Sequence, residues 1–321
     1  MKISVLVPIN EFTPSQIKRL RSLGQVKFIP RRREMSLVQL EKFCRDCQIL
    51  AADPDTLGGF DKAKLKLTEL VLKLPKLKGV AVPTSYTGWI DNKYFNQRQI
   101  PVSFVPGYAT ESVAEHTLAL MLSLAKKTFQ TEMMLGTELA GKTLGIIGLG
   151  KIGSRTAELA LGIGMKVIAC NRTPKKQAGV KIVTLTQLLK QADVISLHVT
   201  DCVGNYRLIG RAEIGLMRPG AMVVNTIGNA KMVDERSMAK ALKFGKIAGY
   251  AYEAEDLEHT PLKNLKTAVG LHNFAWYTRE SLVRLADIWI DDIAGLAKGK
   301  PQSVVNYVTL FDARAIESVT W

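Results

Sequence analysis

The sequence predicts an α/β protein with two doubly wound parallel sheets, and three observations lead to this prediction. Apolar strand-like runs alternate with amphipathic helical patterns over the first hundred residues. Residues 141–173 then present a strand, a glycine-rich turn, a helix and a second strand. The chain has 321 residues, of which 47% are hydrophobic, and this is enough to form two separate cores.

The first hundred residues contain strand-like runs at intervals that leave room for a helix after most of them. The strands are predicted at Ile3–Val7, Val26–Ile29, Ile49–Ala52, Gly79–Val82 and Val102–Phe104. The helices between them are predicted at 14–23, 36–45 and 63–74, with a short one after Asp91. Because helices connect the strands, we expect the strands to be parallel.

The second half continues this alternation after a long amphipathic helix, which is predicted from Thr110 to Lys126. Residues 128–140 are expected to form a loop. The remaining strands are predicted at 144–147, 166–170, 194–198, 222–225, 247–252 and 267–269. One remaining helix is predicted to begin at Lys151, and the others are predicted at 185–191, 211–217, 234–244 and 278–297.

The glycine-rich turn has the spacing GxGxxG, formed by Gly148, Gly150 and Gly153. Gly148 permits the tight turn, Gly150 lets the backbone approach a pyrophosphate, and Gly153 lets the helix pack closely on the strand. The helix that begins at Lys151 offers N–H groups and the positive end of its dipole. With a strand on each side, this turn predicts a dinucleotide-binding unit.

The end of the second strand distinguishes between the two nicotinamide cofactors. NAD-binding units usually carry Asp or Glu there, which accepts hydrogen bonds from the ribose hydroxyls. This chain instead has Asn171, Arg172 and Thr173, followed by Lys175 and Lys176. No carboxylate is present to repel a 2′-phosphate, and a guanidinium can bind one through two hydrogen bonds. We therefore predict NADP(H) as the cofactor; the alternative is an ordinary basic turn on a basic protein.

Composition narrows the function classes. The formal net charge of +15 would attract an anionic substrate, a phosphorylated cofactor or a polyanion; the interpretation that we prefer for the basic clusters is a solvated basic face. The basic clusters at 31–33 and 62–66 accompany no nucleic-acid motif, so nucleic acid is not a predicted partner. Four cysteines predict a reducing, cytoplasmic setting, and we interpret Cys44 and Cys47 as core residues and predict no metal site. No apolar stretch is long enough to predict a membrane span.

The order of motifs resembles the D-2-hydroxyacid dehydrogenase family across nearly the whole chain. The matching motifs are QIPVSFVPG, ATESVAEHTLALML, GKTLGIIGLGKIG, ADVISLHV, LMRPGAMVVNT, VDERSMAKALKFGKIAGY and AWYTRES. The resemblance implies a Rossmann-type dinucleotide domain with interdomain helices, 106–297, inserted into a smaller flavodoxin-like substrate domain formed by 1–105 and about 298–321. It also implies a homodimer formed through the helix that starts near Thr110 and the loop after it.

The predicted cofactor-binding residues gather at the ends of the strands of the dinucleotide domain and at the start of two helices. They are Thr110, Gly148, Gly150, Lys151, Ile152, Gly153, Asn171, Arg172, Thr173, His198 and Thr226.

In this family an Arg binds the substrate carboxylate and carbonyl, a His donates the proton, and a Glu orients that His. The Arg stands three residues after the Asn of a motif NTxRG. Here the sequence reads VNTIGNAKMVDE, which puts Gly228 or Asn229 at that place. Lys231 is the nearby cation and is our candidate substitute; a surface lysine is the alternative.

The segments that carry the His and the Glu are altered as well. The run GLHNFAWYT puts His272 at the acid position if one residue is inserted, and Asn273 if none is. We predict His272. Counting without a gap puts Ala254 at the Glu position, with Glu253 and Glu255 on either side of it. Either could serve only if the backbone were offset by one residue, because neighbouring side chains of an extended segment point oppositely. We expect Glu253 to serve; a solvent-facing Glu253 is the alternative.

The loop after the fourth strand, 83–91, stands where family members bind the substrate carboxylate through backbone N–H groups. Thr84, Ser85 and Tyr86 occupy it and are predicted to contact the substrate; hydroxyls that bond locally are the alternative. Together these features predict an NADPH-dependent reductase of a small carbonyl or related acceptor other than an ordinary 2-keto acid. The alternative is a catalytically silent dinucleotide-binding sensor or scaffold.

Overall fold

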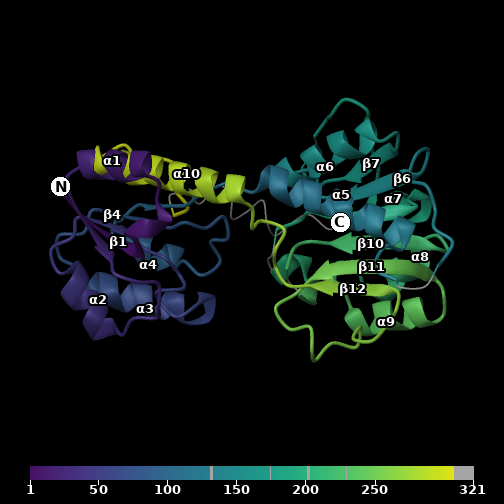
Figure 1. The fold of residues 1–321 in the computed structure, drawn as a ribbon, viewed down its shortest axis with the longest axis horizontal. Helices are drawn as coiled ribbons and strands as arrows, with labels where there is room; N and C mark the ends of the chain where they lie inside the picture. The colour runs from purple at the N-terminus through teal and green to yellow at the C-terminus, as the bar shows by residue number, and fades with distance from the viewer. Residues whose placement is uncertain (131–132, 174, 201–202, 229, 307–321) are drawn as a thin grey trace. The chain divides into compact units, whose positions relative to one another are not determined.

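The computed structural model describes residues 1–130, 133–173, 175–200, 203–228 and 230–306, which form two compact units (Figure 1). Within these ranges, unit 1 comprises residues 1–108 and 279–306, and unit 2 comprises residues 109–278. The chain therefore leaves unit 1, forms unit 2, and returns to unit 1.

Unit 1 is a five-stranded parallel sheet with the strand order β2-β1-β3-β4-β5. Its strands are β1 (Lys2–Pro8), β2 (Gln25–Ile29), β3 (Ile49–Ala51), β4 (Gly79–Ala81) and β5 (Val102–Ser103). Its helices are η1 (Ile9–Glu11), α1 (Pro14–Ser22), α2 (Leu37–Cys44), α3 (Phe60–Leu72), α4 (Asn92–Gln97) and α10 (Arg279–Ala297). Thr13 caps α1 by accepting a hydrogen bond from the Gln16 N–H, which marks where this helix begins.

Helices cover both faces of the sheet of unit 1 (Figure 1). Leu6 of β1 packs with the core beneath α2 and α3, whereas Val5 packs with the core beneath α1 and α10. The two neighbours face opposite sides because successive residues of a strand point to opposite faces. The burial of both residues explains why β1 is apolar at nearly every position.

Helix α10 lies in unit 1. We expected residues 106–297 to form the dinucleotide domain together with interdomain helices. The apolar stripe of α10, which includes Trp289, Ile293 and Leu296, is buried with the strands of unit 1. Gly79 of β4 allows this packing, because a Cβ on Gly79 would lie 2.6 Å from Leu296 Cδ2.

Unit 2 is a seven-stranded sheet with the strand order β12-β11-β10-β9-β6-β7-β8, and all its pairings are parallel. Its strands are β6 (Thr143–Ile147), β7 (Lys166–Cys170), β8 (Val180–Ile182), β9 (Val194–Leu197), β10 (Ala221–Asn225), β11 (Ile247–Glu253) and β12 (Ala268–Leu271). Its helices are α5 (Thr110–Lys126), α6 (Lys151–Gly162), α7 (Leu185–Gln191), η2 (Val203–Asn205), α8 (Arg211–Leu216), η3 (Ala230–Met232) and α9 (Glu235–Lys243).

The core of unit 2 has two layers, one on each side of the sheet. Helices α5 and α6 bury Leu120 and Ala157 against one face, and α7 and α9 bury Leu188 and Met238 against the other. The strand β8 was not predicted, because it is a short edge strand whose Lys181 and Ile182 are exposed. An exposed edge strand lacks the apolar signal that marks a central one.

The two parallel sheets confirm the predicted fold class. In unit 2 the chain moves outward from β6 to β7 and β8, then returns to the other side of β6 to form β9. The carboxyl ends of β6 and β9 therefore form the switch point at which open α/β sheets bind ligands. None of the helices in the described ranges combines the length and the hydropathy needed to cross a bilayer.

Candidate active site

The turn after β6 is held in a shape that only glycines allow. Gly148 has φ +96°, and a Cβ there would lie 2.4 Å from the carbonyl oxygen of His198, at the end of β9. A Cβ on Gly153 would lie 2.1 Å from the carbonyl oxygen of Gly148. Because Gly148 has no side chain, the turn after β6 can lie against the end of β9. Because Gly153 has none, α6 can pack closely on the turn.

The N-terminus of α6 is suited to an anionic group. Its N-cap is Gly150, which has no side chain to bond the first N–H groups of the helix. Among the described residues, no heavy atom outside the turn lies within 4 Å of a Cβ built on Gly150. Lys151 is exposed at the first helical position, and Ile152 beside it is half-buried. The turn and the helix end therefore form a cradle that fits the pyrophosphate of a dinucleotide.

The residues after β7 are bonded to this turn. Asn171 accepts a hydrogen bond from the Leu149 N–H (2.9 Å) through Oδ1, and its Nδ2 donates to the Thr173 carbonyl (2.6 Å). Lys175 Nζ donates to the Leu149 carbonyl (2.8 Å) and to Ser154 Oγ (2.6 Å). Arg172 and Thr173 are exposed beside them. Sequence reasoning noted Lys175 only as part of a basic run, because its contact with the turn depends on how the chain folds back.

Three other predicted cofactor-binding residues lie at strand ends or at the start of α5. His198 follows β9, and its Nε2 lies 3.1 Å from Ser196 Oγ. Burial lowers the pKa of His198 to about 4, so its imidazole is neutral at pH 7. Thr226 follows β10, with its Oγ1 3.4 Å from Thr117 Oγ1 of α5, and Thr110 is the first residue of that helix.

Glu253 is buried at the end of β11, where it bonds the backbone of the segment 272–276. Its Oε1 accepts hydrogen bonds from the N–H groups of Phe274 and Ala275, both at 2.7 Å. The same oxygen lies 3.6 Å from His116 Nε2 of α5. Burial raises the pKa of Glu253, and the two backbone N–H groups oppose that rise. Glu253 therefore points inward, and the solvent-facing alternative does not hold.

The two candidates for the acid position have different surroundings. His272 is exposed, with its ring centroid 5.9 Å from that of Phe274. Asn273 is half-buried against Gly228, where a Cβ would lie 2.9 Å from Asn273 Oδ1. Among the described residues, no hydrogen bond or ion pair joins Glu253 to His272. The structure thus brings Glu253 to His116 rather than to His272.

Lys231 lies in η3, with its Nζ 5.3 Å from the centroid of the Tyr206 ring. This distance is typical of a cation–π contact. The other residue considered at the position of the Arg, Asn229, lies outside the described residues.

The loop after β4 in unit 1 carries the three predicted substrate-binding residues. Thr84 Oγ1 donates to the Tyr86 carbonyl at 2.9 Å, so this hydroxyl bonds locally. Ser85 and Tyr86 are exposed. The ring of Tyr86 lies edge-on to that of Phe60, with the centroids 5.5 Å apart.

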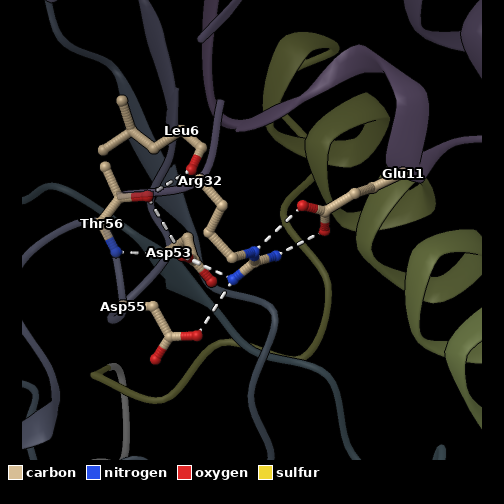
Figure 2. A network of polar contacts seen from close by, with 6 residues as sticks. All are labelled: Leu6, Glu11, Arg32, Asp53, Asp55 and Thr56. Atoms are coloured by element: carbon tan, nitrogen blue, oxygen red, sulfur yellow. Dashed lines mark hydrogen bonds and ion pairs between the residues drawn. The ribbon is translucent and has the colours of Figure 1, made fainter. Parts of the chain in front are cut away.

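A second polar cluster in unit 1 links the carboxyl ends of β1, β2 and β3 (Figure 2). Arg32 donates to Glu11 (2.6 and 3.0 Å), to Asp53 (2.9 Å) and to Asp55 (3.1 Å). Asp53 is buried and also accepts a hydrogen bond from the Thr56 N–H. Burial raises the pKa of Asp53 to about 6, against the opposing charge of Arg32.

No cluster of three or more His, Cys, Asp or Glu side chains in the described part of the chain is arranged to hold a metal ion. The described cysteines Cys44, Cys47 and Cys170 are buried thiols. Cys202 lies outside the described residues.

Comparison with known proteins adds independent information. Residues 112–275 match the family described as D-isomer specific 2-hydroxyacid dehydrogenase, NAD binding domain. A glyoxylate reductase of Aeropyrum pernix is 35% identical over 265 residues, which cover 74% of this chain and 79% of that protein. A D-3-phosphoglycerate dehydrogenase of Archaeoglobus fulgidus is 35% identical over 231 residues, covering 66% of this chain and 44% of that protein.

The fold also matches solved structures. The crystal structure of a D-lactate dehydrogenase from Aquifex aeolicus, complexed with NAD and lactic acid, superposes with a TM-score of 0.72 at 27% identity. The match covers 94% of this chain and 96% of that chain.

Proposed function

This chain belongs to the D-isomer specific 2-hydroxyacid dehydrogenase family, and we propose that it is an NADP(H)-dependent reductase of a small carbonyl or related acceptor. The observation that carries the choice of NADP(H) is the end of β7. Asn171 stands in place of a carboxylate and bonds the glycine-rich turn, while Arg172 is exposed beside it. Such an end accepts a 2′-phosphate without charge repulsion.

The cradle of unit 2 suits a dinucleotide, since the N-cap Gly150 has no side chain to bond the first N–H groups of α6, and a Cβ built on it would meet no described heavy atom outside the turn within 4 Å. When bound, the nicotinamide would supply the hydride. In our assignment, the end of α6 binds the pyrophosphate and Arg172 binds the 2′-phosphate. Glu253 orients the segment 272–276 through two backbone N–H groups. His272 is the titratable residue of that segment, and we assign to it the proton that the acceptor oxygen receives.

The acceptor that we propose is not an ordinary 2-keto acid. In our interpretation of the sequence, Gly228 or Asn229 stands at the place of the Arg that binds the substrate carboxylate in the family, and Lys231 is the remaining candidate cation. Losing a donor of this kind costs on the order of 10²–10³ in rate. We therefore expect slow turnover of glyoxylate or pyruvate. The net charge of +15 still favours a small anionic substrate. We propose that the protein is a cytoplasmic homodimer. We also propose that Thr84, Ser85 and Tyr86 contact the substrate.

The first experiment is a fluorescence titration of the purified protein with NADPH and with NADH. A panel of keto acids, enals and imines then follows, with the nicotinamide absorbance as the readout. Preferential NADPH binding and oxidation by a panel member support the proposal. Equal affinities contradict the choice of NADP(H). Binding without turnover across the panel would favour a silent dinucleotide-binding protein instead.

A further inference from the structure

The segment 272–276 is attached to unit 2 from two elements. From β11, Glu253 accepts hydrogen bonds from the Phe274 and Ala275 N–H groups. From α5, Ser112 Oγ donates to the Ala275 carbonyl at 2.5 Å. His116 lies one turn further along the same face of α5, because residues i and i+4 of a helix are neighbours. Its Nε2 is directed at Glu253, 3.6 Å from the oxygen that bonds the segment.

Strand periodicity explains why Glu253 meets α5. Alternate residues of β11 face opposite sides of the sheet, and Ala251 packs in the core beneath α5 and α6. Glu253, two residues later, shares that side. Tyr250 and Tyr252 face the other side, where Tyr250 meets Asn225 and both rings lie in the core with α9. The two tyrosine hydroxyls are therefore not the groups that face His116.

Among the described residues of the elements packed on α5, Glu253 supplies the charged side chain that lies next to His116. The elements packed on α5 are α6, β10 and β11. The charged residues of α6 are Lys151, which is exposed, and Arg155 and Glu158, which pair with each other while Arg155 also binds Glu111. The strand β10, with the sequence AMVVN, has no charged residue.

His116 Nε2 is buried and has no hydrogen-bond partner within the described residues, although its side chain as a whole is 25% exposed. Buried imidazole nitrogens are usually bonded, and a buried carboxylate needs donors or a counter-charge. If His116 Nε2 and the Glu253 carboxylate move slightly closer together, the Nε2–H tautomer of His116 donates a hydrogen bond to Glu253. That bond satisfies both requirements. Burial lowers the pKa of His116 and raises that of Glu253, so burial disfavours the charged form of each group.

We infer that His116 is a positioning residue of the reaction site, the third N–H donor to the Glu253 carboxylate, and that it thereby fixes the segment that carries His272 and Asn273. This inference rests on the proposed function insofar as that segment serves a reaction. The contact itself is tested without a substrate.

The first test is amide hydrogen exchange. His116→Leu removes the donor, whereas His116→Gln keeps an N–H at a similar reach and removes the titration. We expect the Phe274 and Ala275 amides to exchange about tenfold faster in H116L and at close to the wild-type rate in H116Q. The control is His259→Leu, since His259 is exposed and pairs with Asp256. Unchanged exchange in a folded H116L protein overturns the inference.

The second test needs no His116 variant, so it holds if H116L fails to fold. The chain has four histidines, so histidine-labelled protein gives four imidazole signals in a carbon–proton spectrum. Glu253→Gln is expected to lower the titration midpoint of His116 by about one pH unit, and Glu255→Gln, at an exposed neighbour, is expected to leave it in place. An unchanged midpoint in E253Q overturns the inference.

Activity separates this inference from the proposed function. With an accepted substrate, H116L is expected to lower kcat about tenfold, while the Kd for NADPH stays at the wild-type value and H116Q restores turnover. A weaker Kd for NADPH with unchanged kcat contradicts a positioning role. A wild-type protein that turns over no acceptor overturns the proposed reductase, whereas the exchange and titration results still decide the role of His116.

Discussion

Gly153 lies so close to Gly148 that a Cβ on Gly153 would stand 2.1 Å from the Gly148 carbonyl oxygen. This distance is well below any ordinary carbon–oxygen contact, and the obstacle is backbone rather than a flexible side chain. The turn and the first turn of α6 must therefore separate if residue 153 gains a side chain. The third glycine of the motif thus has a packing role that is independent of any bound ligand.

Gly153→Ala is expected to lower the free energy of unfolding by about 1–3 kcal/mol and to weaken dinucleotide binding, because the turn must move. The matched control is Gly162→Ala at the other end of α6, where no described heavy atom lies within 4 Å of a built Cβ. That change should stabilise the protein by up to about 1 kcal/mol, since alanine favours a helix over glycine. Urea unfolding of both variants measures the difference; equal effects would contradict the packing role.

Arg172→Asp is expected to weaken NADPH binding by at least about 100-fold and NADH binding much less, because it removes a cation from the expected 2′-phosphate and adds a like charge. Lys166→Asp is the control, since Lys166 is exposed at the opposite end of the same strand. Fluorescence titrations with both nucleotides give the ratio of Kd values. Equal losses for the two nucleotides would show that Arg172 does not contact a 2′-phosphate.

The lowered pKa of His198 predicts that the folded protein loses stability in acid. Its folded pKa of about 4 lies below the ordinary value of 6.5, so the unfolded chain binds the proton first as the pH falls. The contribution of His198 is complete above pH 6.5 and declines down to about pH 4, by up to about 3 kcal/mol. Urea unfolding from pH 7 to 4 should show a smaller decline in His198→Gln than in the wild type. His259→Gln, at an exposed histidine, should decline like the wild type.

Arg32→Ala is expected to destabilise unit 1 more at pH 7.5 than at pH 5. Asp53 is 4% exposed, and its pKa of about 6 means that it is charged at the higher pH and protonated at the lower one. Removing Arg32 therefore leaves a buried unpaired carboxylate only at the higher pH. We expect a loss of about 1–3 kcal/mol at pH 7.5 and less at pH 5. The exposed neighbour Arg33→Ala is the control, and a loss independent of pH would contradict this account.

Much of the architecture was predictable from local patterns. Strands such as β1 and β7 are apolar runs of the expected length, and the glycines of 148–153 are spaced for a turn between strand and helix. The family followed from the order of motifs and is confirmed by the match of residues 112–275. The choice of NADP(H) and the catalytic assignments stay predictions.

Two features that the sequence analysis did not predict, the packing of α10 in unit 1 and the strand β8, have physical causes. The sequence of α10 shows an apolar stripe but not the sheet on which that stripe packs, so it did not reveal that α10 packs in unit 1. The strand β8 escaped notice because its side chains are mostly exposed, which removes the apolar pattern.

By itself, the sequence determined the two parallel sheets and the glycine cradle, because these depend on the spacing of residues close together in the chain. It also determined the family, through the order of motifs along the chain. The tertiary structure alone decided that Glu253 meets His116 and that Lys175 binds the turn at Leu149. It also decided that Asn273 packs against Gly228. These contacts join residues from separate strands, helices and loops. Their distances are set by how whole elements pack, which no local pattern encodes.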